Sequence, residues 1–257
     1  MKRVAIIGGS GLERLLAGQQ HSPISTPFGD VSYIKRIEAP FPLFFLPRHG
    51  PQHAAPPHAV NYRANIWAIA ALDVSRIIAV SAVGSMDPEI PPGSFVIPDN
   101  AIDFTRRRTA TFFENEAAHV DMTQPFCPEV RSALINACRE NQVRVYDNGV
   151  YVCTEGPRFE TAAEIQFYRR IGGTVVGMTL FPELPLAREK GICYASLCVV
   201  TNFAAGISSR ITVEEVFTRM RKLTATIRSI LLRAATLIPE QRSCTCGAAL
   251  QRVADFI

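Results

Sequence analysis

The sequence predicts a single α/β domain with a largely parallel central sheet. Short, almost unbroken apolar runs alternate with amphipathic runs, which is the pattern of buried strands and covering helices. The strand-like runs are residues 4–7, 31–37, 41–46, 76–80, 95–98, 149–153, 175–179 and 193–200. The helix-like runs are residues 61–72, 129–141, 162–171, 184–190 and 213–237, the last with Thr212 as its N-cap.

Composition narrows the class of protein. The chain has 257 residues, of which 47% are hydrophobic and 19% charged, so it can bury a core without disulfides. A formal charge of +4 with one short basic cluster, Arg106 to Arg108, does not indicate a nucleic-acid groove. We interpret that cluster as a solvated loop, with phosphate contact as the alternative. Neither a membrane-spanning run nor a signal peptide is predicted, so we expect a cytoplasmic protein.

Cysteine usage indicates reduced thiols. Several of the seven cysteines lie in apolar runs and are expected to be buried. Cys244 and Cys246 lie in residues 241–257, a C-terminal tail beyond the predicted domain of residues 1–240. One such pair does not supply the four ligands of a tetrahedral zinc site, so no metal is predicted. A vicinal redox pair, a crosslink and two free thiols remain open for it.

Residues 153–164 form the most informative loop. They connect a predicted strand to a predicted helix, the place where open α/β sheets bind ligands. Phe159 offers an aromatic face and Glu160 a carboxylate, which together suit a flat heterocycle carrying an N–H group. The alternative is a Gly-Pro turn in which Thr161 caps the helix and Glu164 completes a capping box.

Polar side chains follow six predicted strands. The carboxyl ends of parallel strands meet at one edge of a sheet, so we expect these side chains to converge. Hydroxyl and cationic groups suit an oxyanion such as phosphate, and they are Ser10, Arg48, His49, Ser81 and Thr179. The remaining groups suit a nucleobase, and they are Phe159, Glu160 and Asn202. Phosphate beside a nucleoside indicates phosphorolysis. The turn Gly8-Gly9-Ser10-Gly11 lacks the third glycine of a dinucleotide-binding loop, so no nicotinamide cofactor is expected.

Several motifs in order resemble one family. They are Ile6-Ile7-Gly8-Gly9-Ser10-Gly11, Arg48-His49-Gly50, Val60-Asn61-Tyr62-Arg63-Ala64-Asn65, Glu155-Gly156-Pro157-Arg158-Phe159 and Gly177-Met178-Thr179. From residue 4 to about residue 235 the chain resembles the purine nucleoside phosphorylase and methylthioadenosine phosphorylase family. The resemblance implies a single α/β domain with a mixed, partly barrel-like central sheet flanked by helices. It also implies a homotrimer or a dimer of trimers, inorganic phosphate as co-substrate, and no metal or organic cofactor.

The resemblance also implies residue roles. Phosphate-binding positions of the family match Ser10, Arg48, His49, Ser81, Ala82 (through its backbone) and Thr179. Met178 matches the residue that packs under the ribose, and Phe159 the residue against the base. His119 matches a residue that reaches the sugar pocket of a neighbouring subunit.

The base and sugar positions point to different branches of the family. Asn202-Phe203-Ala204 replaces the Asp-Tyr-Asp of methylthioadenosine phosphorylases, and with Glu160 it resembles the 6-oxopurine pattern. At the 5′ end of the sugar, this chain has Val213 in the matching region, which resembles the apolar pocket for a methylthio group. We therefore predict phosphorolysis of 5′-methylthioinosine, inosine or guanosine, with Asn202 and Glu160 stabilising the departing base and His49 holding phosphate. Methylthioadenosine phosphorolysis is the rival activity, and a non-catalytic nucleoside-binding protein is the alternative of another class.

Overall fold

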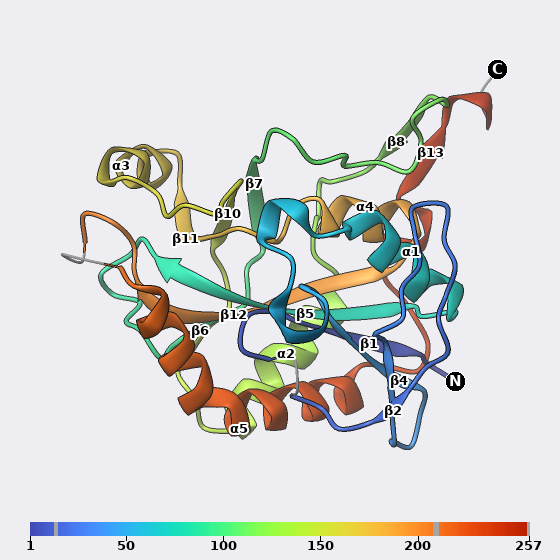
Figure 1. The fold of residues 1–257 in the computed structure, drawn as a ribbon, viewed down its shortest axis with the longest axis horizontal. Helices are drawn as coiled ribbons and strands as arrows, with labels where there is room; N and C mark the ends of the chain where they lie inside the picture. The colour runs from blue at the N-terminus through green and yellow to red at the C-terminus, as the bar shows by residue number, and fades with distance from the viewer. Residues whose placement is uncertain (13–14, 208–210, 256–257) are drawn as a thin grey trace.

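The computed structural model describes residues 1–257 except 13–14, 208–210 and 256–257, and it is an α/β fold with a mixed sheet covered by helices on both faces (Figure 1). The strands are β1 (Val4–Gly8), β2 (Gln19–Gln20), β3 (Lys35–Ile37), β4 (Leu43–Pro47), β5 (Arg76–Ser85), β6 (Phe95–Val96), β7 (Asn100–Phe104), β8 (Ala118–Val120), β9 (Val145–Tyr146), β10 (Val150–Thr154), β11 (Gly173–Gly177), β12 (Cys193–Phe203) and β13 (Leu250–Arg252). The helices are α1 (Tyr62–Ala71), α2 (Pro128–Glu140), α3 (Ala162–Arg170), α4 (Glu183–Glu189) and α5 (Val213–Leu237). Short 3-10 turns cover Pro51–His53, Pro57–Ala59, Thr245–Ala248 and Val253–Asp255.

Strand β5 organises the sheet. On one side it runs parallel to β12 along almost its whole length. On the other side its first half runs parallel to β1, and its end runs antiparallel to β11. Strands β4, β10 and β7 continue the sheet in parallel on the two flanks. The predicted parallel centre is therefore present, and the antiparallel β5–β11 pair makes the sheet mixed, as the family resemblance implied.

The change of partner along β5 opens the sheet. Its register with β1 ends at Ala79, and its register with β11 begins at Gly84. The intervening residues 80–83 face neither strand on that side, although they still pair with β12. The change of strand partner therefore leaves space for a ligand in the middle of the sheet, and no long loop is needed to form it.

Two apolar cores cover the two faces of the sheet. Helices α2 and α5 pack on one face, and Leu134 and Ile230 are fully buried there. Helices α1 and α4 pack on the other face, around Ile66 and Leu184. Helix α3 lies beyond β10 and β11 over a third, smaller core. Each face is covered by a pair of helices, which explains why the central strands are apolar on both sides.

Several predicted elements are confirmed closely. Helix α5 spans the predicted residues, and the Thr212 side chain accepts a hydrogen bond from the backbone N–H of Glu215. The capping box of α3 is present, with Thr161 accepting from the Glu164 backbone and Glu164 accepting from the Thr161 backbone. The alternative interpretation of residues 153–164 as a capped turn is thus correct for its second half.

Other local predictions are wrong. Strand β5 continues through residues 81–85, beyond the predicted end at residue 80, and Asn202 lies within β12 and not after it. Strand β5 is closely packed there, since a Cβ on Gly84 would lie 3.3 Å from Asn202 Nδ2 and 3.4 Å from Val176. Strands β7 and β8 were not predicted, because edge strands with exposed polar residues lack the apolar signal.

The C-terminal residues 241–255 pack against the domain. Strand β13 pairs antiparallel with β8, placing Gln251 opposite His119. Cys246 is buried in the core beneath α2 and α5. The sequence analysis considered Cys244 and Cys246 as a pair alone, whereas in the structure Cys127 and Cys193 lie beside them.

Candidate active site

A cavity of about 200 Å³ lies at the opening between β1 and β11. Its walls come from the ends of β1, β4, β10 and β11, from β5 and β12, and from the start of α5. Every predicted site residue except His119 lines it, namely Ser10, Arg48, His49, Ser81, Ala82, Phe159, Glu160, Met178, Thr179, Asn202, Ala204 and Val213. The expected convergence of the strand ends is therefore found.

Arg48 is held by a carboxylate that the sequence analysis did not predict. Its Nε and Nη2 donate to the two carboxylate oxygens of Glu183, each at 2.8 Å, and its Nη1 donates to the carbonyl of Val80 at 2.8 Å. Arg48 is 1% exposed and Glu183 is fully buried. Burial alone would lower the pKa of Arg48, but Glu183 raises it above its ordinary value. The guanidinium is thus permanently charged, rigid and partly neutralised by its partner.

Hydroxyl groups and backbone complete this end of the cavity. The hydroxyls of Ser81 and Thr179 lie 3.4 Å apart across the opening in the sheet. The imidazole Nδ1 of His49 lies 2.9 Å from the carbonyl of Ala55, which orients the ring. Gly9 admits no side chain, because a Cβ there would lie 2.7 Å from the carbonyl oxygen of Val80. This end is a compact array of hydrogen-bonding groups suited to a tetrahedral oxyanion.

Glu160 lies at the other end of the cavity. The Thr154 hydroxyl donates to Glu160 Oε1 at 2.6 Å. Burial raises the pKa of Glu160 above its ordinary value, and the hydrogen bond from Thr154 opposes only part of this shift. Since Thr154 occupies one carboxylate oxygen, the other is the one available to a ligand.

Asn202 is fixed within its strand. It is 5% exposed, and the Thr201 hydroxyl donates to its Oδ1 at 2.8 Å. A Cβ on Gly84 would lie 3.3 Å from Asn202 Nδ2, so the amide packs directly over the backbone of β5. A buried, oriented amide at the cavity wall is suited to hydrogen-bonding one edge of a ring.

Arg108 fixes the loops that carry the ligand-facing residues. Its Nη1 donates to the carbonyls of Met178 at 2.7 Å and Phe181 at 2.6 Å, and its Nη2 to the carbonyl of Glu155 at 2.5 Å. Its side chain is 3% exposed. The interpretation of the basic cluster as a solvated loop is therefore wrong for Arg108, because orphan carbonyls of two loops need a donor there.

The wall near α5 is apolar. Val213, Val216 and Phe217 line the cavity from the first turns of the helix. Val213 is 59% exposed, so this end is open to solvent in the single chain. The cavity therefore combines polar groups with an apolar wall at the start of α5.

His119 is the one predicted site residue that lies elsewhere. It is on β8, exposed, and does not line the cavity. This position agrees with the expectation that it serves another subunit and does not test it.

Sequence reasoning missed several groups of the site. They are Glu183, Thr154, Thr201 and Arg108, which hold the ligand-facing residues in place. Glu183 lies 135 residues from Arg48, and no local pattern links the two. A fully buried acidic residue at the start of a short helix becomes noteworthy only once its burial is known.

The fold and the site together identify the class of protein. The model of the phosphorylase superfamily matches residues 3–236, and the chain belongs to that family. The resemblance noted from the motifs is confirmed, and so is the mixed α/β fold.

Particular relatives are close over the full length. A 6-oxopurine nucleoside phosphorylase of Pyrococcus furiosus is 50% identical, with 98% of each chain covered. A protein of Methanopyrus kandleri named "Probable S-methyl-5′-thioinosine phosphorylase" is 44% identical, again with 98% of each chain covered. Among solved structures, methylthioadenosine phosphorylase from Schistosoma mansoni in complex with adenine is similar with a TM-score of 0.90 and 33% identity, covering 97% of this chain and 96% of that one.

Proposed function

We propose that the chain catalyses the phosphorolysis of 6-oxopurine nucleosides, with 5′-methylthioinosine, inosine and guanosine as candidate substrates. Inorganic phosphate is the co-substrate, and the products are the free purine and ribose 1-phosphate or its methylthio analogue. Family membership and full-length relatives at 44% to 50% identity support purine nucleoside phosphorolysis, the reaction of a pentosyltransferase. The 6-oxopurine assignment rests on one observation: Glu160 and Asn202 line the same cavity as the oxyanion-binding groups.

The base preference follows from hydrogen-bond chemistry. A 6-oxopurine offers an N1–H donor and a 6-carbonyl acceptor, whereas adenine offers a bare N1 and an amino group. Ionised Glu160 accepts from N1–H and repels the lone pair of a bare N1. The Asn202 amide donates to the 6-carbonyl. N7 of the nucleoside carries a lone pair, and once N7 takes a proton from solvent as the base departs, Asn202 Oδ1 accepts from the new N7–H. A site built on such bonds discriminates strongly, because the wrong base leaves buried groups unpaired.

The reaction needs positioning and electrostatics rather than a protein nucleophile. As the C1′–N9 bond breaks, its electron pair leaves with the purine and the ribosyl ring becomes cationic. Glu160 and Asn202 hold the departing base. A phosphate oxygen, placed by Arg48, His49 and the hydroxyls, supplies the electron pair for the new C1′–O bond. Holding both reactants in one cavity converts an encounter of two molecules into a unimolecular step.

The sugar end of the cavity supports a methylthio substituent. Val213, Val216 and Phe217 form an apolar wall where a 5′ substituent would emerge. A hydrophobic wall rejects a hydroxyl only weakly, so inosine and guanosine remain substrates in this proposal. The likeness to a methylthioadenosine phosphorylase structure keeps the adenine nucleoside as the rival substrate.

One panel tests the proposal. Inosine, guanosine, methylthioinosine and methylthioadenosine are each incubated with and without phosphate, and base release is followed by ultraviolet absorbance. We expect phosphate-dependent release from the 6-oxopurine nucleosides. Preferential turnover of methylthioadenosine would contradict the base assignment. Lack of phosphate-dependent release from any nucleoside would favour the non-catalytic alternative.

Assembly and location remain predictions. A trimer or a dimer of trimers would allow exposed His119 to reach a neighbouring sugar pocket. Light scattering after size exclusion gives the mass, and His119→Ala should raise the nucleoside KM if the pocket is shared. No helix in the described part of the chain is long and apolar enough to cross a membrane. A cytoplasmic role in purine salvage stays a prediction.

A further inference from the structure

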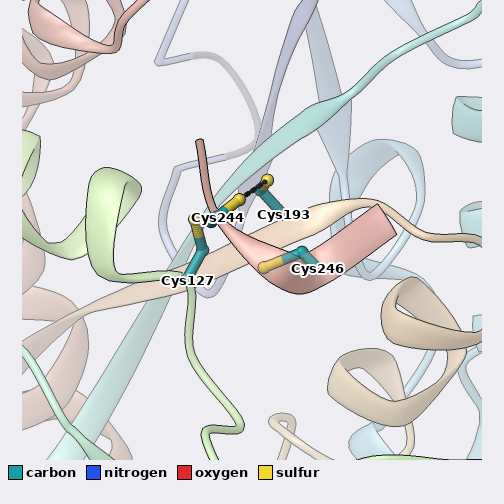
Figure 2. A group of neighbouring side chains, drawn as sticks. All are labelled: Cys127, Cys193, Cys244 and Cys246. Carbon is teal, nitrogen blue, oxygen red and sulfur yellow. Dashed lines mark hydrogen bonds between the residues drawn. The ribbon is translucent and has the colours of Figure 1, made fainter. Parts of the chain in front are cut away.

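Four cysteine thiols converge far from the proposed active site. They are Cys127, Cys193, Cys244 and Cys246, and their Sγ atoms all lie within 4.8 Å of one another (Figure 2). Three separate segments supply them: the N-cap of α2, the first residue of β12, and the turn that begins the last 3-10 segments. Three of the four thiols are buried, and Cys244 is half-buried. None of them lines the active-site cavity.

We propose that these four thiolates bind one Zn²⁺ ion as a structural site. A tetrahedron with metal–sulfur bonds of about 2.3 Å has sulfur–sulfur edges of about 3.8 Å. The Cys193 and Cys244 sulfurs are 3.3 Å apart, and every pair lies within 4.8 Å, so the observed separations span that edge. The shortest separation of 3.3 Å is longer than the S–S bond of a disulfide, which is about 2.05 Å.

Local backbone geometry explains how a spacing of two residues supplies two ligands. Cys244 has an extended backbone, with φ −75° and ψ 160°, and the chain turns directly after it into a 3-10 helix. This change of direction lets the side chains of Cys244 and Cys246 face a common point (Figure 2).

The surroundings suit an anionic centre. A zinc ion with four thiolates carries a net charge of −2. Arg188, which is 3% exposed, donates from Nη1 to Cys246 Sγ at 3.6 Å. Such bonds to ligating sulfur are typical of the groups around structural metals.

A second buried cation lies beside the cluster. Arg76 is paired in register with Cys193 across β5 and β12, and it is 3% exposed. Its Nε and Nη2 have no hydrogen-bond partner within the described residues. One carboxylate is also near: Glu129 Oε1 accepts from the backbone N–H of Cys244 at 3.0 Å. Two guanidinium groups against one carboxylate leave a local excess of positive charge, which would offset part of the negative charge of a thiolate-bound zinc.

The site would hold the C-terminal segment on the domain. It would join the start of α2, the start of β12 and residues 244–246, beyond which β13 pairs with β8. Arg188 extends the connection, because its Nε and Nη2 donate to the carbonyl of Asp121 directly after β8. Zinc binding releases the thiol protons to solvent, and no electron transfer is involved.

Metal content of matched variants tests the proposal. The full chain is purified under reducing conditions from zinc-supplemented medium, and zinc per chain is measured by mass spectrometry. We expect about one zinc in the parent and in Cys138→Ala, and less than about a tenth of that in Cys246→Ala. Cys138 is the matched control, because it is buried in the same core but outside the cluster. Retention of zinc by Cys246→Ala, or a parent without zinc, would overturn the site.

Two measurements on the parent do not require a variant to fold. Exchange of zinc for Co²⁺ should give the visible spectrum of tetrahedral thiolate coordination, and chelation should lower Tm by about 5 °C or more. In a separate preparation purified without reductant, alkylation after denaturation should modify all seven cysteines without prior reduction. Disulfide-bonded cysteines in freshly purified protein, or iron in place of zinc, would refute the proposal.

Discussion

Replacing Glu160 with glutamine should reverse the base preference. Thr154 Oγ1 donates to Glu160 Oε1 at 2.6 Å, so a glutamine at this position keeps that bond only by placing its oxygen toward Thr154. Its NH₂ group then faces the ligand. The NH₂ group and the N1–H of a 6-oxopurine are both donors and cannot form a hydrogen bond with each other. The same NH₂ group can donate to the bare N1 of adenine.

The size of the effect follows from the bonds involved. A hydrogen bond to a charged group contributes about 1.5 to 3 kcal/mol, and an unpaired buried donor costs about 1 to 3 kcal/mol. Together these terms reach about 2.5 to 6 kcal/mol. We therefore expect kcat/KM for inosine and methylthioinosine to fall by about 10² to 10⁴ in Glu160→Gln. For methylthioadenosine the value should rise or stay unchanged.

The assay is the four-nucleoside panel with saturating phosphate. Glu164→Gln is the matched control, because Glu164 belongs to the capping box of α3 and does not line the cavity. It should leave the ratio of inosine to methylthioadenosine turnover unchanged. Equal losses on both classes of nucleoside in Glu160→Gln would refute the assigned contact with N1.

The pH dependence offers an independent check of the same residue. Burial raises the pKa of Glu160, and N1–H binding needs the carboxylate, so kcat/KM for inosine should fall on the acid side at a pH above the ordinary value for glutamate. That acid limb should disappear in Glu160→Gln. A raised carboxyl pKa also means that ionisation of Glu160 lowers folding stability as pH rises from the unfolded to the folded pKa. The glutamine variant should therefore be no less stable than the parent at neutral pH.

Three further substitutions separate binding from stability. Asn202→Ala should lower kcat on 6-oxopurine nucleosides by about 10² to 10³, because it removes stabilisation of the departing base; near-normal turnover would exclude that role. Glu183→Gln should cost about 3 to 5 kcal/mol of folding stability by leaving the Arg48 charge poorly paired; an unchanged Tm would show that the pair is dispensable. Val213→Ser should raise the KM for methylthioinosine about tenfold but change that for inosine little; parallel changes would place the 5′ substituent elsewhere.

Most residues facing the cavity could be predicted because they follow an apolar run of the sequence. Ser10 follows β1 and Thr179 follows β11, and parallel strands bring such ends together. The reasoning succeeded for Ser81 and Asn202 although the predicted loops are strands. Both residues lie further along the strand in which the apolar run was predicted. The change of partner along β5 places them at the opening in the sheet.

The supporting groups could not be predicted, because they act over long sequence separations. Glu183 meets Arg48 across 135 residues, and Cys193 meets Cys244 across 51. Neither pair belongs to a periodic pattern, so only tertiary packing reveals it. The same holds for β8 and β13, whose polar residues are brought together at an edge by a C-terminal segment that the sequence marks as a tail.

The Arg48–Glu183 pair explains how the cavity can serve a cationic reaction centre. An uncompensated guanidinium beside C1′ would oppose the positive charge that develops on the ribosyl ring. Glu183 neutralises part of that field while holding the guanidinium where it donates hydrogen bonds. In the proposed reaction, bound phosphate would then be the main negative charge next to the ring. It would stabilise the transition state more than the ground state, since the ring acquires its charge only as the base departs.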